Sequence, residues 1–160
     1  MTVQVGQEMP AGVFRVMTDD GPVATSTEDL FSGRKVVLVS VPGAFTSTCS
    51  KYHLPGYVAA ADEMFGKGVD TIAFMAVNDV DVMHAWGNDQ SVGDKIVMLA
   101  DGNGDYTRAL DLEFDATRSG MGRRGRRFAI IIDDGKASHV AVEEPGKFEI
   151  SSAEAILRRL

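Results

Sequence analysis

Cys49 is the only cysteine in the 160-residue sequence, and it is the residue best suited to nucleophilic or redox chemistry. It ends the segment AFTSTC, and residues 50–65 are expected to form a helix. Cys49 then lies in the first turn of that helix. Unpaired backbone N–H groups and the positive end of the helix dipole favour a thiolate over a thiol at this place, and the thiolate is the nucleophilic form.

Thr46 stands three residues before Cys49 and adds a second group suited to the same chemistry. Its hydroxyl can donate a hydrogen bond to a thiolate or accept one from a bound hydroperoxide. The plain alternative is that Cys49 is a small buried hydrophobic residue, as lone cysteines commonly are. The local pattern leaves both interpretations open.

Three apolar runs rich in β-branched residues predict buried strands, at residues 35–42, 69–77 and 128–133. Segments with helical character lie between and after them, at residues 50–65, 80–88, 106–110 and 152–160. This alternation predicts an α/β fold. The turn Asp133-Asp134-Gly135 predicts an antiparallel hairpin at the end, so the central sheet is expected to be mixed.

Length and composition predict a single domain over residues 1–160. The net charge of -7 and the pI near 4.9 argue against a broad basic surface, so neither nucleic acid nor a membrane is an expected partner. The first residues lack the pattern of a secretory leader, and no apolar stretch reaches membrane-spanning length. A cytoplasmic location is the resulting expectation.

The segment VPGAFTSTCSKYHLPGYV (residues 41–58) resembles the active-site segment of peroxiredoxins. The signature of that family is a proline, a threonine four residues later and a cysteine three residues further, and Pro42, Thr46 and Cys49 match it. Three further stretches are similar to the type II branch, the peroxiredoxin-five group, at residues 78–86, 99–112 and 126–135.

The resemblance implies a thioredoxin-like fold and a peroxidase reaction in which the Cys49 thiolate attacks a hydroperoxide and becomes a sulfenic acid. Thr46 is implied to position the peroxide, and Pro42 to shape the site. The family's active-site arginine precedes an aromatic residue that opens a strand, which assigns it to Arg127 rather than Arg126. A guanidinium stabilises a thiolate and orients peroxide oxygens through its fork of donors. No cofactor is implied.

With one cysteine in the sequence, the sulfenic acid is expected to be reduced by an external thiol, either glutathione with glutaredoxin or thioredoxin. Some relatives carry a resolving cysteine near the C-terminus, where this chain has Ser151 and Ser152. Two further residues depart from the family pattern. Ser47 replaces a usual proline in the active-site loop, and Asp81 replaces a phenylalanine of the dimer interface, which weakens the expectation of a homodimer.

Other patterns have plainer explanations than the chemistry they imitate. His53 lies four residues after Cys49, but no third ligand completes a metal site, and a residue at the edge of the pocket or in the packing is the preferred interpretation. Asp101-x-Asn103-x-Asp105 lacks the glycine and glutamate of a calcium loop, and Gly102-Asn103-Gly104 lacks the third glycine of a dinucleotide fingerprint. An arginine cluster at residues 118–127 could touch RNA, but a solvated loop with one functional arginine is the simpler account.

Two hypotheses remain beside the enzyme. One is a redox-sensing or interaction protein of thioredoxin-like fold that signals through oxidation of Cys49. The other is a silent interaction module in which Cys49 is merely buried. Catalytic turnover with a thiol donor distinguishes the enzyme from both.

Overall fold

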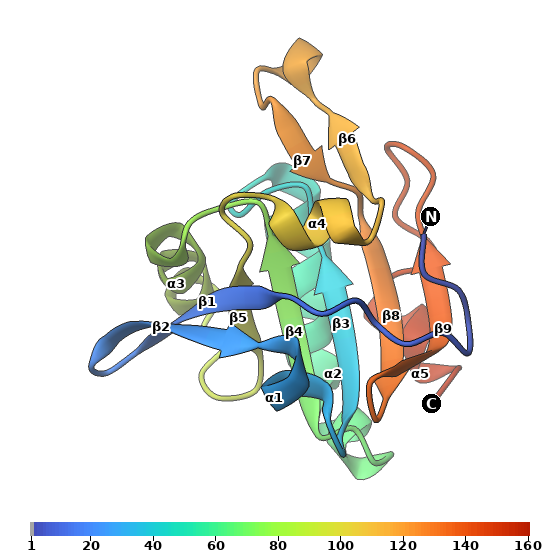
Figure 1. The fold of residues 1–160 in the computed structure, drawn as a ribbon. Coiled ribbons are helices and arrows are strands. Elements are labelled where there is room, and N and C mark those ends of the chain that lie inside the picture. The colour runs from blue at the N-terminus through green and yellow to red at the C-terminus, as the bar shows by residue number, and fades with distance from the viewer. Residues whose placement is uncertain (1) are drawn as a thin grey trace.

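A mixed seven-stranded sheet forms the centre of the structure, a computed structural model that describes residues 2–160 (Figure 1). Its strands are β1 (Val13–Thr18), β2 (Gly21–Ser26), β3 (Lys35–Ser40), β4 (Thr71–Ala76), β5 (Val97–Ala100), β8 (Phe128–Asp133) and β9 (Lys136–Val142), in the spatial order β2-β1-β5-β4-β3-β8-β9. Strands β3, β4 and β5 are parallel, whereas β1, β8 and β9 pair antiparallel with their neighbours. The predicted mixed sheet and terminal hairpin are confirmed.

Helices cover both faces of the sheet, and a small hairpin projects from one end (Figure 1). The helical segments are α1 (Thr27–Phe31), the π-helical η1 (Cys49–His53), α2 (Leu54–Gly66), α3 (Val80–Asp89), α4 (Asp105–Ala109), the 3-10 turn η2 (Thr117–Ser119) and α5 (Ala153–Leu157). The hairpin consists of β6 (Glu113–Asp115) and β7 (Arg123–Gly125). Among residues 2–160, no helix is long and apolar enough to cross a membrane.

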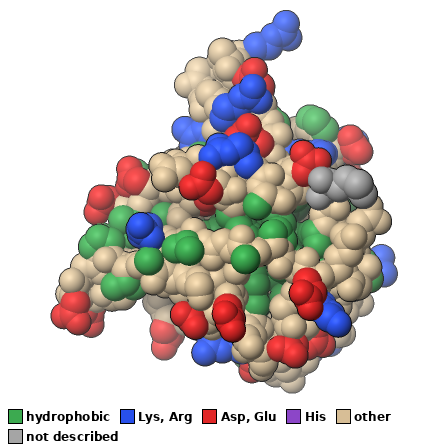
Figure 2. Space-filling view, in the orientation of Figure 1, with side chains coloured by type: hydrophobic (Ala, Val, Ile, Leu, Met, Phe, Trp, Pro, Cys, Tyr) green, Lys and Arg blue, Asp and Glu red, His purple; other side chains and the backbone are tan. Residues whose placement is uncertain are grey.

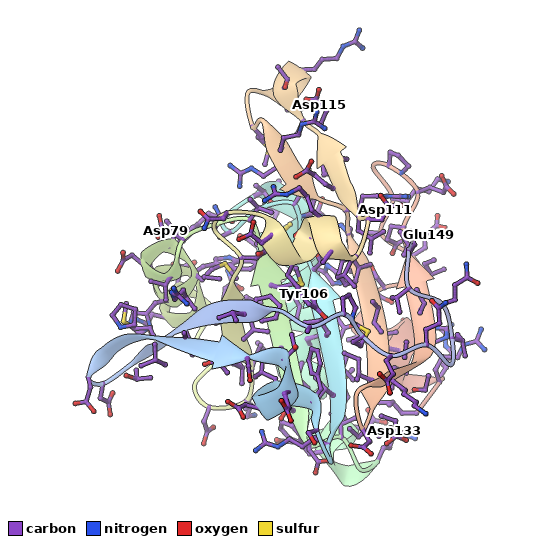
Figure 3. All side chains as sticks on the ribbon, viewed as in Figure 1. Asp79, Tyr106, Asp111, Asp115, Asp133 and Glu149 are labelled. Carbon is purple, nitrogen blue, oxygen red and sulfur yellow. The ribbon has the colours of Figure 1, made fainter. Side chains whose placement is uncertain are left out.

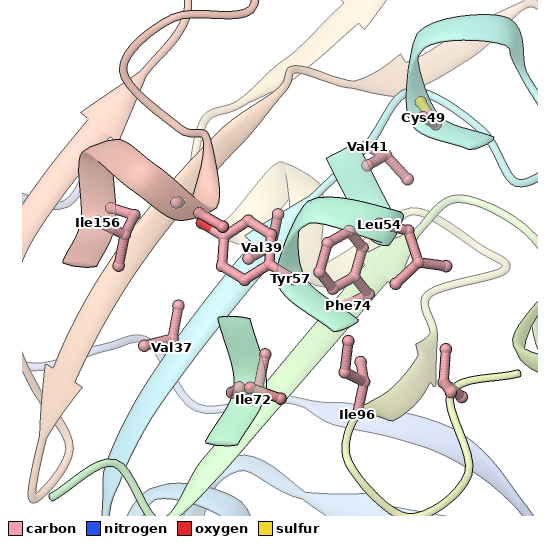
Figure 4. Close-up of a cluster of buried hydrophobic side chains, with 14 of the residues drawn as sticks. Val37, Val39, Val41, Cys49, Leu54, Tyr57, Ile72, Phe74, Ile96 and Ile156 are labelled. Atoms are coloured by element: carbon pink, nitrogen blue, oxygen red, sulfur yellow. The ribbon is translucent and has the colours of Figure 1, made fainter. Parts of the chain in front are cut away.

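Alternate residues of the central strands supply two hydrophobic cores, one on each face of the sheet. In β3, Val37 and Val39 pack with α2, α3 and α5, whereas Val36 and Leu38 pack on the opposite face with α1 and α4. This explains why the strand is apolar throughout: both of its faces are covered. Cys49 belongs to the first core and lies at one end of it, near Val41 (Figure 4).

Tyr106 fixes α4 and the N-terminal segment against the second core (Figure 3). Its ring meets Phe14 edge-on at 4.9 Å between centroids, and its hydroxyl donates to the Pro10 carbonyl at 3.0 Å. A Cβ at Gly12 would stand 2.4 Å from the Tyr106 ring, so glycine allows the backbone to approach the ring this closely.

The strand register brings three separate segments to one end of the sheet. Ser40, the last residue of β3, pairs with Phe128, the first residue of β8, and Phe128 also pairs with Val142, the last residue of β9. The residues that follow β3, precede β8 and follow β9 therefore meet. Arg127 is the residue before β8, and the active-site loop follows β3.

Several elements were not predicted from the sequence. The hairpin β1–β2 is mostly exposed or half-buried, so it lacks the continuous apolar run that identified the central strands. Strand β5 has only four residues. The arginine-rich segment, expected to be a loop, contains the short strand β7. Helix α5 ends at Leu157, three residues before the predicted end.

Candidate active site

Cys49 lies in the first turn of a helical segment, as expected, and its side chain is 0% exposed. Helical residues begin at Ser47, and the Thr46 carbonyl accepts the Ser50 N–H at 2.9 Å. The next turn is wider than an α-helical one, because the Leu54 N–H bonds to the carbonyl of Cys49, five residues back. The cysteine thus begins a π-helical turn that leads directly into α2.

Arg127 supplies the polar partner of the sulfur. Its Nη2 donates to Cys49 Sγ at 3.2 Å, although the two residues are 78 positions apart. Arg126 points elsewhere and donates from Nη2 to the Glu143 carbonyl at 2.7 Å. The two neighbouring arginines thus have different partners, and Arg127 places a permanent cation at the thiol.

Thr46 directs its hydroxyl proton away from the sulfur. Oγ1 donates to the Gly43 carbonyl at 2.7 Å, which closes the loop before the helix. Its oxygen lone pairs remain available as acceptors. Of the two uses considered from the sequence, this arrangement suits acceptance of a bond from a peroxide O–H; donation to a thiolate is not what the structure shows.

A pocket of about 190 Å³ opens beside the thiol. It is lined by Pro42, Thr48, Phe114, Arg126, Arg127, Glu143, Glu144, Pro145, Gly146 and Lys147. Pro42 forms part of this wall, and Arg127, another lining residue, connects the pocket with the buried Cys49 sulfur. The pocket has room for a small hydroperoxide next to the Arg127 guanidinium.

His53 is a site residue whose role the sequence did not reveal. It is 0% exposed; its Nδ1 lies 2.7 Å from Arg127 Nη1 and its Nε2 lies 2.9 Å from the Ser151 carbonyl. Burial, together with the Arg127 charge, lowers the pKa of His53 from 6.5 to about 3. The spacing of four residues from Cys49 was the available signal; it indicated a metal pattern, a pocket-edge position or packing, but not a bond to Arg127.

The segment after β9 is held by a buried carboxylate. Glu143, 3% exposed, accepts from the Glu149 N–H at 2.7 Å, the Ser151 N–H at 2.9 Å and the Ser151 hydroxyl at 2.7 Å. Burial opposes its ionisation, but these hydrogen bonds outweigh burial and lower the pKa of Glu143. Ser151 thus anchors this segment to the Glu143 carboxylate.

The remaining motifs have structural explanations. The Asp101 carboxylate accepts from the Tyr106 and Thr107 N–H groups and from the Thr107 hydroxyl, so it fixes the start of α4. Within residues 2–160 no cluster of three His, Cys, Asp or Glu side chains is placed to hold a metal.

The arginine cluster at residues 118–127 also has structural partners. Within it, Arg124 donates to the Met121 and Val77 carbonyls. Lys and Arg side chains alternate with acidic ones on the projecting hairpin (Figure 2).

Fold and site together define a thioredoxin-like protein with one buried cysteine at a helix start, paired with an arginine from the segment that precedes β8. Comparisons with known proteins specify the class further. The family model described as Redoxin matches residues 4–157. Peroxiredoxin-2B of Arabidopsis thaliana is 43% identical over 159 residues, which cover 99% of this chain and 98% of the relative.

Solved structures agree with this match. Reduced Prx3 from Vibrio vulnificus in complex with hydrogen peroxide has 47% identity and a TM-score of 0.95, with 99% of each chain covered. A structure described as a putative thioredoxin reductase from Burkholderia cenocepacia has 42% identity and a TM-score of 0.98, covering 100% of this chain and 99% of the other. The chain belongs to the redoxin family and, within it, to the type II peroxiredoxins. It is a thiol-dependent peroxidase, and the redox-sensing alternative is not favoured.

Proposed function

We propose that the Cys49 thiolate attacks the distal oxygen of a hydroperoxide held in the pocket beside it. A sulfur–oxygen bond forms as the O–O bond breaks, the hydroxyl group passes to the sulfur, and the departing oxygen takes a proton from solvent and leaves as water or an alcohol. Cys49 is oxidised to a sulfenic acid, and the peroxide is reduced. The observation that carries this assignment is the 3.2 Å contact between Arg127 Nη2 and Cys49 Sγ.

Arg127 and Thr46 have complementary roles in this step. The guanidinium stabilises the thiolate and the negative charge that develops on the departing oxygen. The Thr46 oxygen accepts the peroxide O–H, because its own proton is committed to the Gly43 carbonyl. Pro42 limits the width of the pocket and holds the peroxide near the sulfur. Hydrogen peroxide as a substrate is supported by its presence in the Vibrio vulnificus Prx3 structure.

The sulfenic acid is reduced by thiols from other molecules. A first thiol condenses with it to release water and leave a mixed disulfide, and a second thiol attacks that disulfide and restores Cys49. Glutathione with glutaredoxin and thioredoxin are the two donor systems proposed. The sequence contains one cysteine, so no second thiol of the same chain takes part.

A kinetic panel tests the proposal. Loss of hydrogen peroxide and of an alkyl hydroperoxide is followed with glutathione plus glutaredoxin, and separately with thioredoxin and its reductase. We expect turnover with at least one donor in the parent protein and none in Cys49→Ser. Absence of turnover with both donors and both peroxides contradicts the proposed cycle. The cytoplasmic location and the homodimer stay predictions.

A further inference from the structure

The two ring nitrogens of His53 face partners of opposite kind. A backbone carbonyl only accepts hydrogen bonds, so Nε2, at 2.9 Å from the Ser151 oxygen, carries the ring proton. A guanidinium only donates, so Nδ1, at 2.7 Å from Arg127 Nη1, is the bare nitrogen that accepts. The surroundings therefore fix both the tautomer and the neutral state of the imidazole.

Arg127 is thereby held at two of its nitrogens. Nη1 donates to His53 Nδ1 and Nη2 donates to Cys49 Sγ. The Phe148 ring lies 5.7 Å from the guanidinium carbon and 4.8 Å, centroid to centroid, from the His53 ring. With one amino group bound to the histidine, rotation of the planar fork away from the sulfur breaks a short, charge-assisted bond.

His53 in turn rests on a rigid support. The Ser151 carbonyl that accepts its Nε2–H also accepts the Tyr57 hydroxyl at 2.8 Å, and the Ser151 N–H and hydroxyl bind the Glu143 carboxylate. All of these side chains are buried. A continuous series of hydrogen bonds therefore runs from Glu143 through Ser151 and His53 to Arg127, and ends at the sulfur.

We propose that His53 is a positioning residue of the peroxidase reaction: its unprotonated Nδ1 holds the Arg127 guanidinium on the Cys49 sulfur, and the Ser151 carbonyl fixes the tautomer that makes this possible. The inference rests on the proposed role of Cys49 and Arg127. It adds a residue that acts through Arg127.

The charges around His53 support the same state. Arg127 faces it as a cation, and Glu143 is the carboxylate that acts on it; Tyr57 and Cys49 are the other titratable groups in its surroundings. Burial and Arg127 together lower the pKa of His53 to about 3, so the ring stays neutral at the pH of any peroxidase assay. A protonated Nδ1 would place donor against donor.

Two substitutions separate the two nitrogens. In His53→Gln the amide nitrogen reaches the position of Nε2, so the bond to Ser151 is kept and the acceptor for Arg127 is lost. In His53→Asn the side-chain oxygen lies near the position of Nδ1, so the acceptor is kept and the bond to Ser151 is lost. A purely structural role predicts that activity follows the stability of each variant.

The readouts are the second-order rate of Cys49 oxidation by hydrogen peroxide in single turnover, the pH profile of Cys49 alkylation by iodoacetamide, and the melting temperature. We expect His53→Gln to lower the oxidation rate about tenfold and to move the alkylation midpoint about one pH unit upward. His53→Asn is expected to keep the oxidation rate within about a factor of two or three of the parent, and the alkylation midpoint within about half a pH unit, despite a lower melting temperature. Equal losses in both variants, or a larger loss in His53→Asn, overturn the proposal.

Nitrogen-15 NMR of labelled parent protein tests the proposal without relying on a variant that folds. We expect His53 to show a protonated Nε2 and a bare Nδ1 from pH 5 to pH 8; a protonated Nδ1 overturns the inference. If the parent Cys49 does not react with peroxide, the proposed function fails, whereas the alkylation profile and the tautomer still report on His53.

Discussion

The bond between Arg127 and Cys49 depends on which of two adjacent arginines faces the sulfur. Both belong to the same short segment before β8, and successive residues of an extended chain point to opposite sides. Arg127 faces the thiol, and Arg126 reaches the Glu143 carbonyl. The two residues thus form a natural matched pair for testing the role of a cation at this site.

Replacement of Arg127 with alanine is expected to reduce the rate of Cys49 oxidation by hydrogen peroxide about 100-fold or more, because a preorganised donor at the reacting atoms is lost. Arg126→Ala is expected to lose far less, about threefold, since Arg126 lines the pocket but bonds to the Glu143 carbonyl rather than to the sulfur. Stopped-flow oxidation of the reduced protein measures both rates. Similar losses in the two variants contradict the assignment of Arg127.

The buried neutral His53 is expected to make stability depend on pH. Its pKa is lowered to about 3 in the folded state, so below about pH 6.5 the unfolded chain binds a proton that the folded chain does not. The free energy of unfolding therefore falls as the pH drops, by about 2 kcal/mol between pH 7 and pH 5 from this group alone. Urea unfolding at the two pH values measures the change.

His53→Gln is expected to remove that component of the pH dependence, while the exposed His84, changed to Gln, serves as the control that keeps it. The lowered pKa of Glu143 acts in a different range: its contribution is present above the ordinary glutamate pKa and is lost only as the pH falls through the lowered value. An unchanged slope in His53→Gln contradicts the proposed neutral state.

At the level of elements, the junction of loop and helix determines where Cys49 stands. Helical residues begin at Ser47, so Ser47 is the first helical position and the Cys49 N–H belongs to the first turn. The sequence predicted a helix over residues 50–65 with Cys49 in its first turn, because apolar spacing is a local signal; the helical residues in fact begin three residues earlier, at Ser47. The π-helical turn over Cys49–His53 was not predicted, since a bond to the fifth rather than the fourth residue leaves no clear trace in composition.

Ser47→Pro is expected to raise the stability of the protein by about 0.5 to 1 kcal/mol without reducing peroxidase activity. Proline suits the first helical position, where the N–H has no helical partner, and it restricts the unfolded chain. Thermal unfolding and the single-turnover rate measure the two effects.

Ser50→Pro is the contrasting variant. It removes an N–H that donates to the Thr46 carbonyl and a hydroxyl that accepts from Trp86 Nε1. We expect a loss of about 3 kcal/mol or more. If Ser47→Pro destabilises the protein to a similar degree, the helix does not begin where the structure places it.

For the molecule as a whole, the parts predicted from sequence are those whose signal is local. Apolar runs identified β3, β4 and β8, and the signature segment identified Cys49, Thr46 and Pro42 as candidates. The partners of His53 could not be predicted in this way, because Arg127 and Ser151 reach it only through the pairing of β3, β8 and β9. Hairpin β1–β2 was missed because its side chains are mostly exposed or half-buried.

Self-association of the whole molecule is expected to depend on Asp81, which is exposed in the first turn of α3. A carboxylate loses solvation when an apolar interface forms over it. Asp81→Phe is therefore expected to strengthen dimerisation about tenfold or more, as measured by sedimentation over a range of concentrations. Asp89→Phe, an exposed position at the other end of α3, is the control. Equal association of both variants contradicts an interface at Asp81.

The 78 positions between Cys49 and Arg127 also have a consequence for biosynthesis. During translation the cysteine leaves the ribosome long before the arginine that stabilises its thiolate has been made. Until β8 pairs with β3, the nascent chain carries an ordinary thiol, which reacts slowly with peroxide and is correspondingly protected from oxidation. Rapid reactivity of Cys49 is therefore acquired late. Its appearance in a time course of synthesis marks the moment at which β8 pairs with β3.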